Sequence, residues 1–159
     1  MADDRPRPSL DTAKFEEGVM VGYRYWDQFT QKPLFPFGAG LSYTTFTMKG
    51  IAVKPSPDGS ATVDVQVKNT GKRAGSEVVQ LYLGFPKSAG EPPRQLKGFE
   101  KVALQPGEEK NAHITLDADA FKYWSEQTHA WTTAAGSYQG MAGRSSREIV
   151  WTAPVMPSR

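Results

Sequence analysis

The feature that most constrains this chain is the strict alternation of valine with polar residues in TVDVQVKNTG, residues 62–71. Successive side chains of a strand point to opposite faces of its sheet. The three valines, Val63, Val65 and Val67, are therefore predicted to point into a core, and the polar residues between them to solvent. Asn69-Thr70-Gly71 predicts a turn that ends the strand. The segment is typical of a half-buried antiparallel strand.

The same alternation recurs in two later segments. In EVVQLYLG, residues 77–84, we expect the hydrophobic set Val79, Leu81 and Leu83 to face the core. Gln80 and Tyr82 then lie on the other face, where the Tyr82 ring is buried and its hydroxyl stays in water, and Gln80→Ala is expected to be near neutral. In NAHITLD, residues 111–117, the core set is Ala112, Ile114 and Leu116.

Turn residues cut the rest of the chain into short segments, because 15 Gly and 12 Pro occur among 159 residues. This excludes long helices. EEGVMVGYRYWDQ is predicted to be strand-like and apolar on both faces. AFKYWSEQTHAWTT forms two aromatic-rich strands or one bent strand, and GSYQGMAGRSSREIVW one last strand. About seven strands from Phe46 to Trp151 predict an all-β, two-sheet antiparallel sandwich of the immunoglobulin or fibronectin type III kind, with an extended N-terminal segment.

Composition removes several classes of function. The chain has no Cys, and 19 Lys and Arg are balanced by 17 Asp and Glu in scattered positions. This excludes a disulfide scaffold and a Cys-ligated metal, and gives no nucleic-acid footprint. No apolar run approaches the roughly 20 residues of a membrane span. The length favours one domain.

No residue is predicted to be catalytic, to bind a metal or to bind a cofactor. His113 and His129 lack partners at ligand spacing and are interpreted as solvated or hydrogen-bonded histidines. Adjacent carboxylates such as Glu16-Glu17 point to opposite faces of a strand, so they do not converge on one substrate atom. Asp117 and Asp119 are a weaker alternative as a calcium turn, because a Ca²⁺ shell needs six to eight oxygens.

The aromatic residues allow two interpretations. Trp124 and Trp131, with Tyr82, are candidates for an exposed surface that stacks on sugars. The alternative is that these rings pack within the sandwich, where large aromatic side chains usually lie.

The segments EEGVMVGYRYWDQFTQKPLFPFGAGLSYTTF, VKNTGKRAGSEVVQLYLG and RQLKGFEKVALQPGEEK, in this order, carry a resemblance. Over about residues 15–150 the chain resembles the C-terminal fibronectin type III-like domain of family-3 glycoside hydrolases of the β-glucosidase type. The resemblance implies a disordered leader at 1–13 and a remnant of the preceding α/β sandwich domain with a linker at 14–41. The fibronectin type III-like domain follows at 42–153, and a tail at 154–159.

The resemblance also implies a function. The catalytic carboxylates of that family belong to two other domains, and no Ser-Asp-Trp motif occurs here. The chain is therefore expected to be no enzyme on its own, but an accessory domain that stabilises and orients those catalytic domains, its partners. The residues expected to dock on these catalytic domains are Tyr23, Trp26, Phe35 and Phe37. Weak self-association of the chain is expected when the catalytic domains are absent. The alternative is a module that binds polysaccharide or a lignin-like polymer through Tyr82, Trp124 and Trp131. The compartment stays unassigned, with secretion or a periplasmic location compatible with this family.

Overall fold

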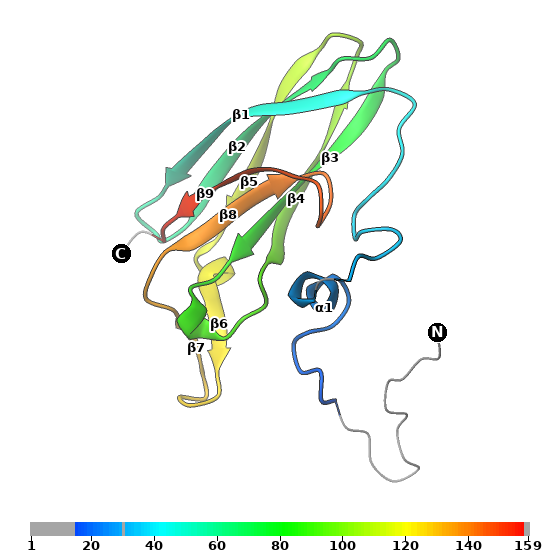
Figure 1. The fold of residues 1–159 in the computed structure, drawn as a ribbon. Coiled ribbons are helices and arrows are strands. Elements are labelled where there is room, and N and C mark those ends of the chain that lie inside the picture. Colours follow the sequence, from blue (N-terminus) through cyan, green and yellow to red (C-terminus); the bar gives the residue numbers. More distant parts are fainter. Residues whose placement is uncertain (1–14, 30, 158–159) are drawn as a thin grey trace.

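The computed structural model describes residues 15–29 and 31–157 and shows an all-β sandwich (Figure 1). One sheet has the strand order β1-β2-β5 and the other β4-β3-β8-β9, with all neighbouring strands antiparallel. This confirms the predicted fold class. The strands are β1 (Phe46–Pro55), β2 (Ala61–Asn69), β3 (Gly75–Gly84), β4 (Gln95–Leu104), β5 (Glu109–Leu116), β8 (Tyr138–Gly143) and β9 (Ile149–Val155).

A separate two-stranded hairpin, β6 (Lys122–Ser125) and β7 (Ala130–Thr133), extends from one end of the sandwich (Figure 1). The other regular elements in the described residues are three short helices: α1 (Tyr23–Gln28), η1 (Lys87–Ala89) and η2 (Ala118–Phe121). None of the helices in the described part of the chain is long and apolar enough to cross a membrane.

The core lies between the two sheets and is built from the hydrophobic sets that the alternation predicts. Val63, Val65 and Val67 of β2 are completely buried, and so are Val79, Leu81 and Leu83 of β3. Ala112, Ile114 and Leu116 of β5 join the same cluster. The period-two pattern therefore identified the inner faces of three strands correctly.

Asn69, at the end of β2, is completely buried and uses the full hydrogen-bonding capacity of its amide. Its Nδ2 donates to the carbonyl oxygens of Arg73, at 2.7 Å, and Leu104, at 3.2 Å. Its Oδ1 accepts from the hydroxyl of Thr44, at 2.8 Å, and from the N–H of Gly71, at 3.0 Å. One side chain thus joins the start of β1, the β2–β3 turn and the end of β4.

The C-terminal strand prediction is wrong, because residues 138–155 form two strands rather than one. A turn separates them: the N–H of Arg144 donates to the carbonyl of Glu148, and the Ser145 hydroxyl accepts from Glu148 N–H. Gly143 permits the close approach, since an added Cβ would lie 2.1 Å from Glu148 O. Serine-capped turns of this kind have a weak sequence signal.

Two further boundaries bear on the domain expectation. Residues 122–133 form two strands, as the first of the two alternatives predicted. The strand β9 continues to Val155, two residues beyond the expected end of the domain at 153. The expected leader, residues 1–13, lies outside the described residues.

Asp64 of β2 lies between two basic side chains, Lys54 and His113, on the outer face of the smaller sheet. Its Oδ2 is 2.6 Å from Lys54 Nζ, and its Oδ1 is 2.6 Å from His113 Nδ1. The hydrogen bond with Lys54, and then the one with His113, holds the pKa of the Asp64 carboxyl below its ordinary value of 3.8. His113 is therefore a hydrogen-bonded histidine, as one of the sequence interpretations had it.

Substitution of Asp64 by asparagine is expected to reduce stability at neutral pH but not in strong acid. A carboxyl whose pKa is lower in the folded chain contributes stability that is present above the unfolded value, near 3.8, and is lost as the pH falls through the folded value. Urea unfolding midpoints of the native chain and Asp64→Asn, measured at neutral pH and near pH 2, should differ at the first pH and converge at the second. A difference that stays constant between these conditions would contradict this linkage.

Candidate functional site

The N-terminal segment, here residues 15–29 and 31–43, lies against the outer face of the larger sheet (Figure 1). Residues 16–28 do not form the predicted strand: turns at 16–19 lead into α1. The helix brings Tyr23, Trp26 and Asp27 to one side, because positions i, i+3 and i+4 share a helix face. That side faces the sandwich. A strand without a neighbouring strand would leave its backbone N–H and C=O groups unpaired, and the tertiary contacts of the helix compensate for that loss.

Tyr23 is the central aromatic contact between this segment and the sandwich. Its ring stacks on Phe37, with centroids 4.8 Å apart, and meets the edge of Tyr82 of β3 at 5.9 Å. Its hydroxyl accepts a hydrogen bond of 2.8 Å from the backbone N–H of Leu96 in β4. Tyr23, one of the expected docking residues, thus packs mainly within this chain.

Tyr82 is completely buried, so its expected role in an exposed polymer-binding surface is wrong. The expectation of a hydroxyl in water is also wrong, because that hydroxyl donates to Oε1 of Gln80. Burial, with smaller contributions from Tyr23 and Asp27, raises the pKa of the Tyr82 phenol. The alternation treated this face of β3 as solvated, whereas the N-terminal segment covers it.

Asp27 of α1 is the charged centre of the contact. Its side chain has no exposed area and lies 3.1 Å from Nε of Arg94 and 3.2 Å from Nε of Arg147. Burial raises the pKa of the Asp27 carboxyl, and the two guanidinium groups oppose that rise. Arg147 also donates to the backbone carbonyl of Trp26. These ion pairs join α1 to the loop before β4 and to the β8–β9 turn.

The proline-rich loop after α1 is held by its backbone. The carbonyl of Phe37 accepts from Ser146 N–H at 2.9 Å, and the carbonyl of Gly38 accepts from Gln80 Nε2 at 3.2 Å. Gly38 has φ of 79°, and an added Cβ would lie 2.2 Å from Gln80 Nε2. The positive φ favours glycine at this position, and a larger residue would also displace the Gln80 amide from its hydrogen bond.

Gln80 is a buried link and not the solvated residue that the alternation predicted. Its Nε2 donates to the carbonyls of Gly38 and, at 2.7 Å, Arg144, while its Oε1 accepts from Tyr82. We expect Gln80→Ala to lower the free energy of unfolding by about 1–3 kcal/mol, since the buried Tyr82 phenol and two carbonyls lose their hydrogen-bond partner. Urea unfolding measures this, and Gln66→Ala is the control. Equal, small losses in both variants would contradict the assignment.

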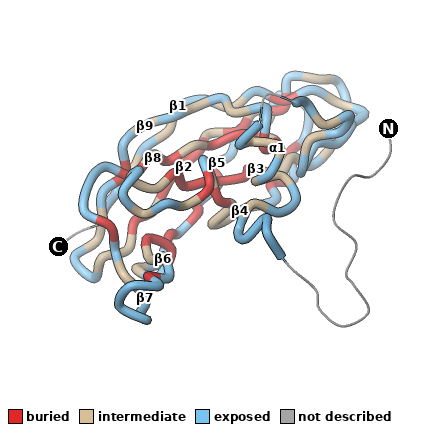
Figure 2. The backbone as a smooth tube through the Cα atoms, turned by 60° about the horizontal axis from the view of Figure 1, so that its bottom comes forward, coloured by how far each residue is buried: buried red, intermediate tan, exposed pale blue. Residues whose placement is uncertain are grey.

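The other face of the N-terminal segment is apolar and exposed, and Figure 2 shows most of it in the exposed class. Ten of the fifteen large hydrophobic side chains that are exposed in the described residues belong to it. Exposed apolar side chains concentrated in one segment favour an interaction with a partner. We call the set the apolar strip: Phe15, Val19, Val21, Tyr25, Phe29, Leu34, Phe35, Phe37, Leu41 and Tyr43.

The four expected docking residues divide between these two faces. Tyr23 points to the sandwich, and Trp26 is half-buried beside it. Phe35 is 81% exposed and Phe37 is 47% exposed, although Phe37 also stacks on Tyr23. The ion pairs of Asp27 with Arg94 and Arg147 were not predicted from the sequence. The spacing of four positions between Tyr23 and Asp27 is compatible with one face of a helix, but the segment was interpreted as a strand.

Trp124 and Trp131 are a cross-strand pair on the β6–β7 hairpin, with exposed fractions of 47% and 65%. Their rings are inclined at 74°, with centroids 5.8 Å apart. Because the indoles are nearly perpendicular, they do not share one flat face for stacking. The neighbouring Tyr123 packs against the core.

The acidic residues singled out in the sequence have structural partners. Asp117 accepts from Ala120 N–H at 2.7 Å and caps η2, and Asp119 pairs with Lys122 at 2.7 Å. His129 has φ of 49° in the turn between β6 and β7. Within the residues that the structure describes, no group of three or more His, Asp and Glu side chains is arranged to hold a metal ion.

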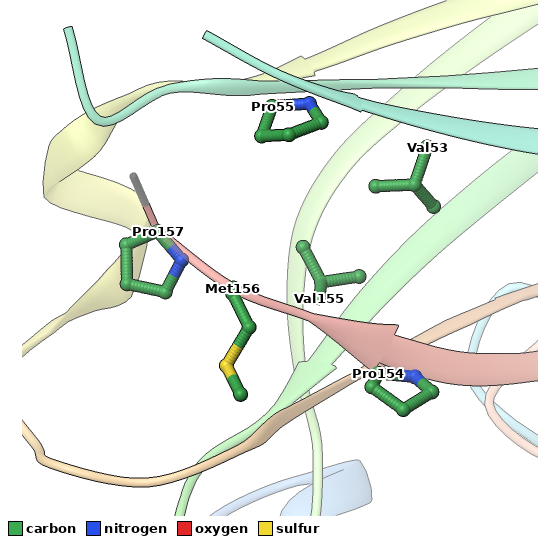
Figure 3. A pocket seen from close by; sticks show the side chains of 6 residues that line it. All are labelled: Val53, Pro55, Pro154, Val155, Met156 and Pro157. Atoms are coloured by element: carbon green, nitrogen blue, oxygen red, sulfur yellow. The ribbon is translucent and has the colours of Figure 1, made fainter. Parts of the chain in front are cut away.

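Two shallow hollows mark the described surface. One of about 330 Å³ lies at the edge where β1 approaches β9 and is entirely apolar in its side chains (Figure 3): Val53, Pro55, Pro154, Val155, Met156 and Pro157. The other, of about 220 Å³, lies between α1 and the following loop. We call it the aromatic hollow: Gly22, Tyr23, Trp26, Pro33, Phe35, Phe37 and Ser146.

The chain is similar in sequence and in structure to part of several known proteins. The fibronectin type III-like domain model matches residues 77–146. The chain is 50% identical over 144 residues to thermostable beta-glucosidase B of Acetivibrio thermocellus, covering 88% of this chain and 19% of that protein. Beta-D-glucoside glucohydrolase from Trichoderma reesei has a TM-score of 0.87 at 32% identity, covering 95% of this chain and 24% of the other. A GH3 beta-glucosidase from Bifidobacterium adolescentis has a TM-score of 0.84 at 42% identity, covering 89% and 21%. The chain therefore spans about a fifth of the length of these relatives.

Proposed function

We propose that the chain is an accessory domain that stabilises and orients the catalytic part of a family-3 beta-glucosidase, because residues 77–146 match the fibronectin type III-like domain model. The observation that carries the proposal is the apolar strip, which covers one face of a segment whose other face is fastened to the sandwich. Because the similar proteins are about five times longer, the remaining part of such an enzyme is the partner that would cover the strip.

The described acidic residues support a non-catalytic role. Glycoside hydrolysis uses two carboxyl groups on either side of the scissile bond, about 5–10 Å apart. Three carboxylates with little exposed side chain are engaged by basic residues: Asp27 by two arginines, Asp64 by Lys54 and His113, and Glu77 by Arg144. Neither of the two hollows is lined by a carboxylate.

The isolated chain is expected to release no nitrophenol from 4-nitrophenyl β-D-glucoside above the rate in buffer, because neither of the two hollows in the described residues offers the two carboxyl groups that the reaction needs. Absorbance at neutral and mildly acidic pH measures this. Turnover that one carboxylate substitution abolishes would contradict the prediction.

A chimera tests the accessory role. The chain replaces the matching 144 residues of the Acetivibrio thermocellus enzyme, with which it is 50% identical. We expect an assembled, active enzyme, whereas the same enzyme without any segment at this position should inactivate much faster on heating. If the chimera is no more heat-resistant than the truncated enzyme, the chain does not stabilise a catalytic part and the proposal fails.

A further inference from the structure

We propose that the aromatic hollow receives one apolar side chain from the catalytic part of the beta-glucosidase, and that Asp27 positions the walls of this hollow. The inference rests on the proposed accessory function and specifies where the docking contact lies and what chemistry it takes.

The size and lining of the hollow define its occupant. Its volume of about 220 Å³ exceeds the share of a single water, about 30 Å³, several-fold. It is smaller than the roughly 300–1,000 Å³ of pockets that enclose small-molecule ligands. Its walls are mostly aromatic rings, with a proline, a glycine and Ser146, and without a charged side chain. A protruding aliphatic or aromatic side chain of a protein partner therefore fits it better than a free sugar.

Two walls of the hollow, Tyr23 and Phe37, are held by contacts within this chain. Tyr23 is fixed by its stacking on Phe37 and by its hydrogen bond with Leu96 N–H. Phe37 is fixed through its carbonyl, which accepts from Ser146 N–H. A preformed apolar pocket loses little conformational entropy when it is filled, which favours tight docking of a single anchor residue.

Asp27 joins these walls to the sandwich. Its side chain is completely buried between Arg94 and Arg147, and it lies one helical turn after Tyr23. Removal of one partner from a buried ion pair leaves the other charges buried and uncompensated. Loss of the Asp27 carboxylate should therefore release α1 from the sandwich while the two sheets stay folded.

Substitution of Phe35 can distinguish docking in the hollow from a general apolar contact. It lines the hollow and is 81% exposed, whereas its neighbour Leu34 is 88% exposed but does not line it. Phe99 of β4 is 68% exposed and lies outside the apolar strip. These three residues give matched variants of similar exposure.

The first experiment introduces Phe35→Ser, Leu34→Ser and Phe99→Ser separately into the chimera and measures thermal inactivation. We expect Phe35→Ser to inactivate about tenfold faster, as for loss of a buried anchor at an interface, and the other two to change the rate less than about twofold. Equal acceleration by Phe35→Ser and Leu34→Ser, without an effect of Phe99→Ser, would overturn the hollow but keep the accessory function. No effect of either Phe35→Ser or Leu34→Ser would overturn both.

The second experiment measures amide hydrogen exchange in the isolated chain carrying Asp27→Ala, with Glu17→Ala as the exposed control. The Leu96 and Ser146 amides report on the N-terminal segment, because they donate to Tyr23 and Phe37. We expect both to exchange at least about tenfold faster in Asp27→Ala, while Gly107, which donates to Asn69 within the sandwich, keeps its rate. Unchanged rates at Leu96 and Ser146 would overturn the positioning role, and so would acceleration at all three amides.

Discussion

Replacement of Leu81 by alanine is expected to lower the free energy of unfolding by about 2–5 kcal/mol, a large part of the roughly 5–15 kcal/mol that is usual for a domain. Leu81 is completely buried in the middle of β3 between the two sheets, so the lost side chain leaves a cavity in the core. Urea unfolding followed by near-ultraviolet circular dichroism measures the change. The slope of the free energy with urea concentration should stay constant.

Gln66→Ala is the control for this substitution. Gln66 lies on β2, and its side chain points away from the core between two buried valines. A change within about 0.5 kcal/mol is expected there, as for most surface substitutions. Similar losses in Leu81→Ala and Gln66→Ala would mean that the register of the sandwich differs from the one described.

Asn69→Ala is expected to cost roughly 2–4 kcal/mol although it removes no hydrophobic contact. The substitution deprives the carbonyl oxygens of Arg73 and Leu104, the Thr44 hydroxyl and the Gly71 N–H of their partner. A buried polar group that loses its hydrogen bond costs about 1–3 kcal/mol, and water can reach only the more exposed of these groups. Thermal and urea unfolding should both show the loss.

The matched control for Asn69→Ala is Asn111→Ala. Asn111 is the same residue type on the neighbouring part of the same sheet, paired with Gln66, but its side chain is exposed. A near-neutral result is expected for it. If Asn69→Ala were also near neutral, the four hydrogen bonds would not stabilise the junction of β1, β2 and β4.

The core of the sandwich could be predicted from the sequence because its signal is local. Val63, Val65 and Val67 alternate with polar residues, and a period of two places all three on one face whatever the rest of the chain does. The same argument held for Val79, Leu81 and Leu83. It failed for Gln80 and Tyr82, because the face opposite the core is covered by residues about 40–60 positions earlier in the chain.

The candidate site could be predicted only in part. The aromatic residues Phe35 and Phe37 stood out as apolar residues on a proline-stiffened loop, and Phe35 is indeed largely exposed. Asp27 did not stand out, since its partners Arg94 and Arg147 come from distant loops and no local spacing links the three. Buried ion pairs between remote segments are tertiary features, and a single sequence carries no periodic signal for them.

The attachment of α1 has a consequence for the order of events during synthesis. The chain emerges from the ribosome N-terminus first, yet Tyr23 must wait for Leu96, 73 positions later, and Trp26 for Arg147, 121 positions later. At about 5–20 residues per second, the second wait lasts about 6–24 s. Throughout that interval the aromatic side chains of the nascent segment lack their packing partners and are accessible to chaperones and other nascent chains. The speed of translation between Trp26 and Arg147 should therefore influence how much of the newly made protein escapes aggregation.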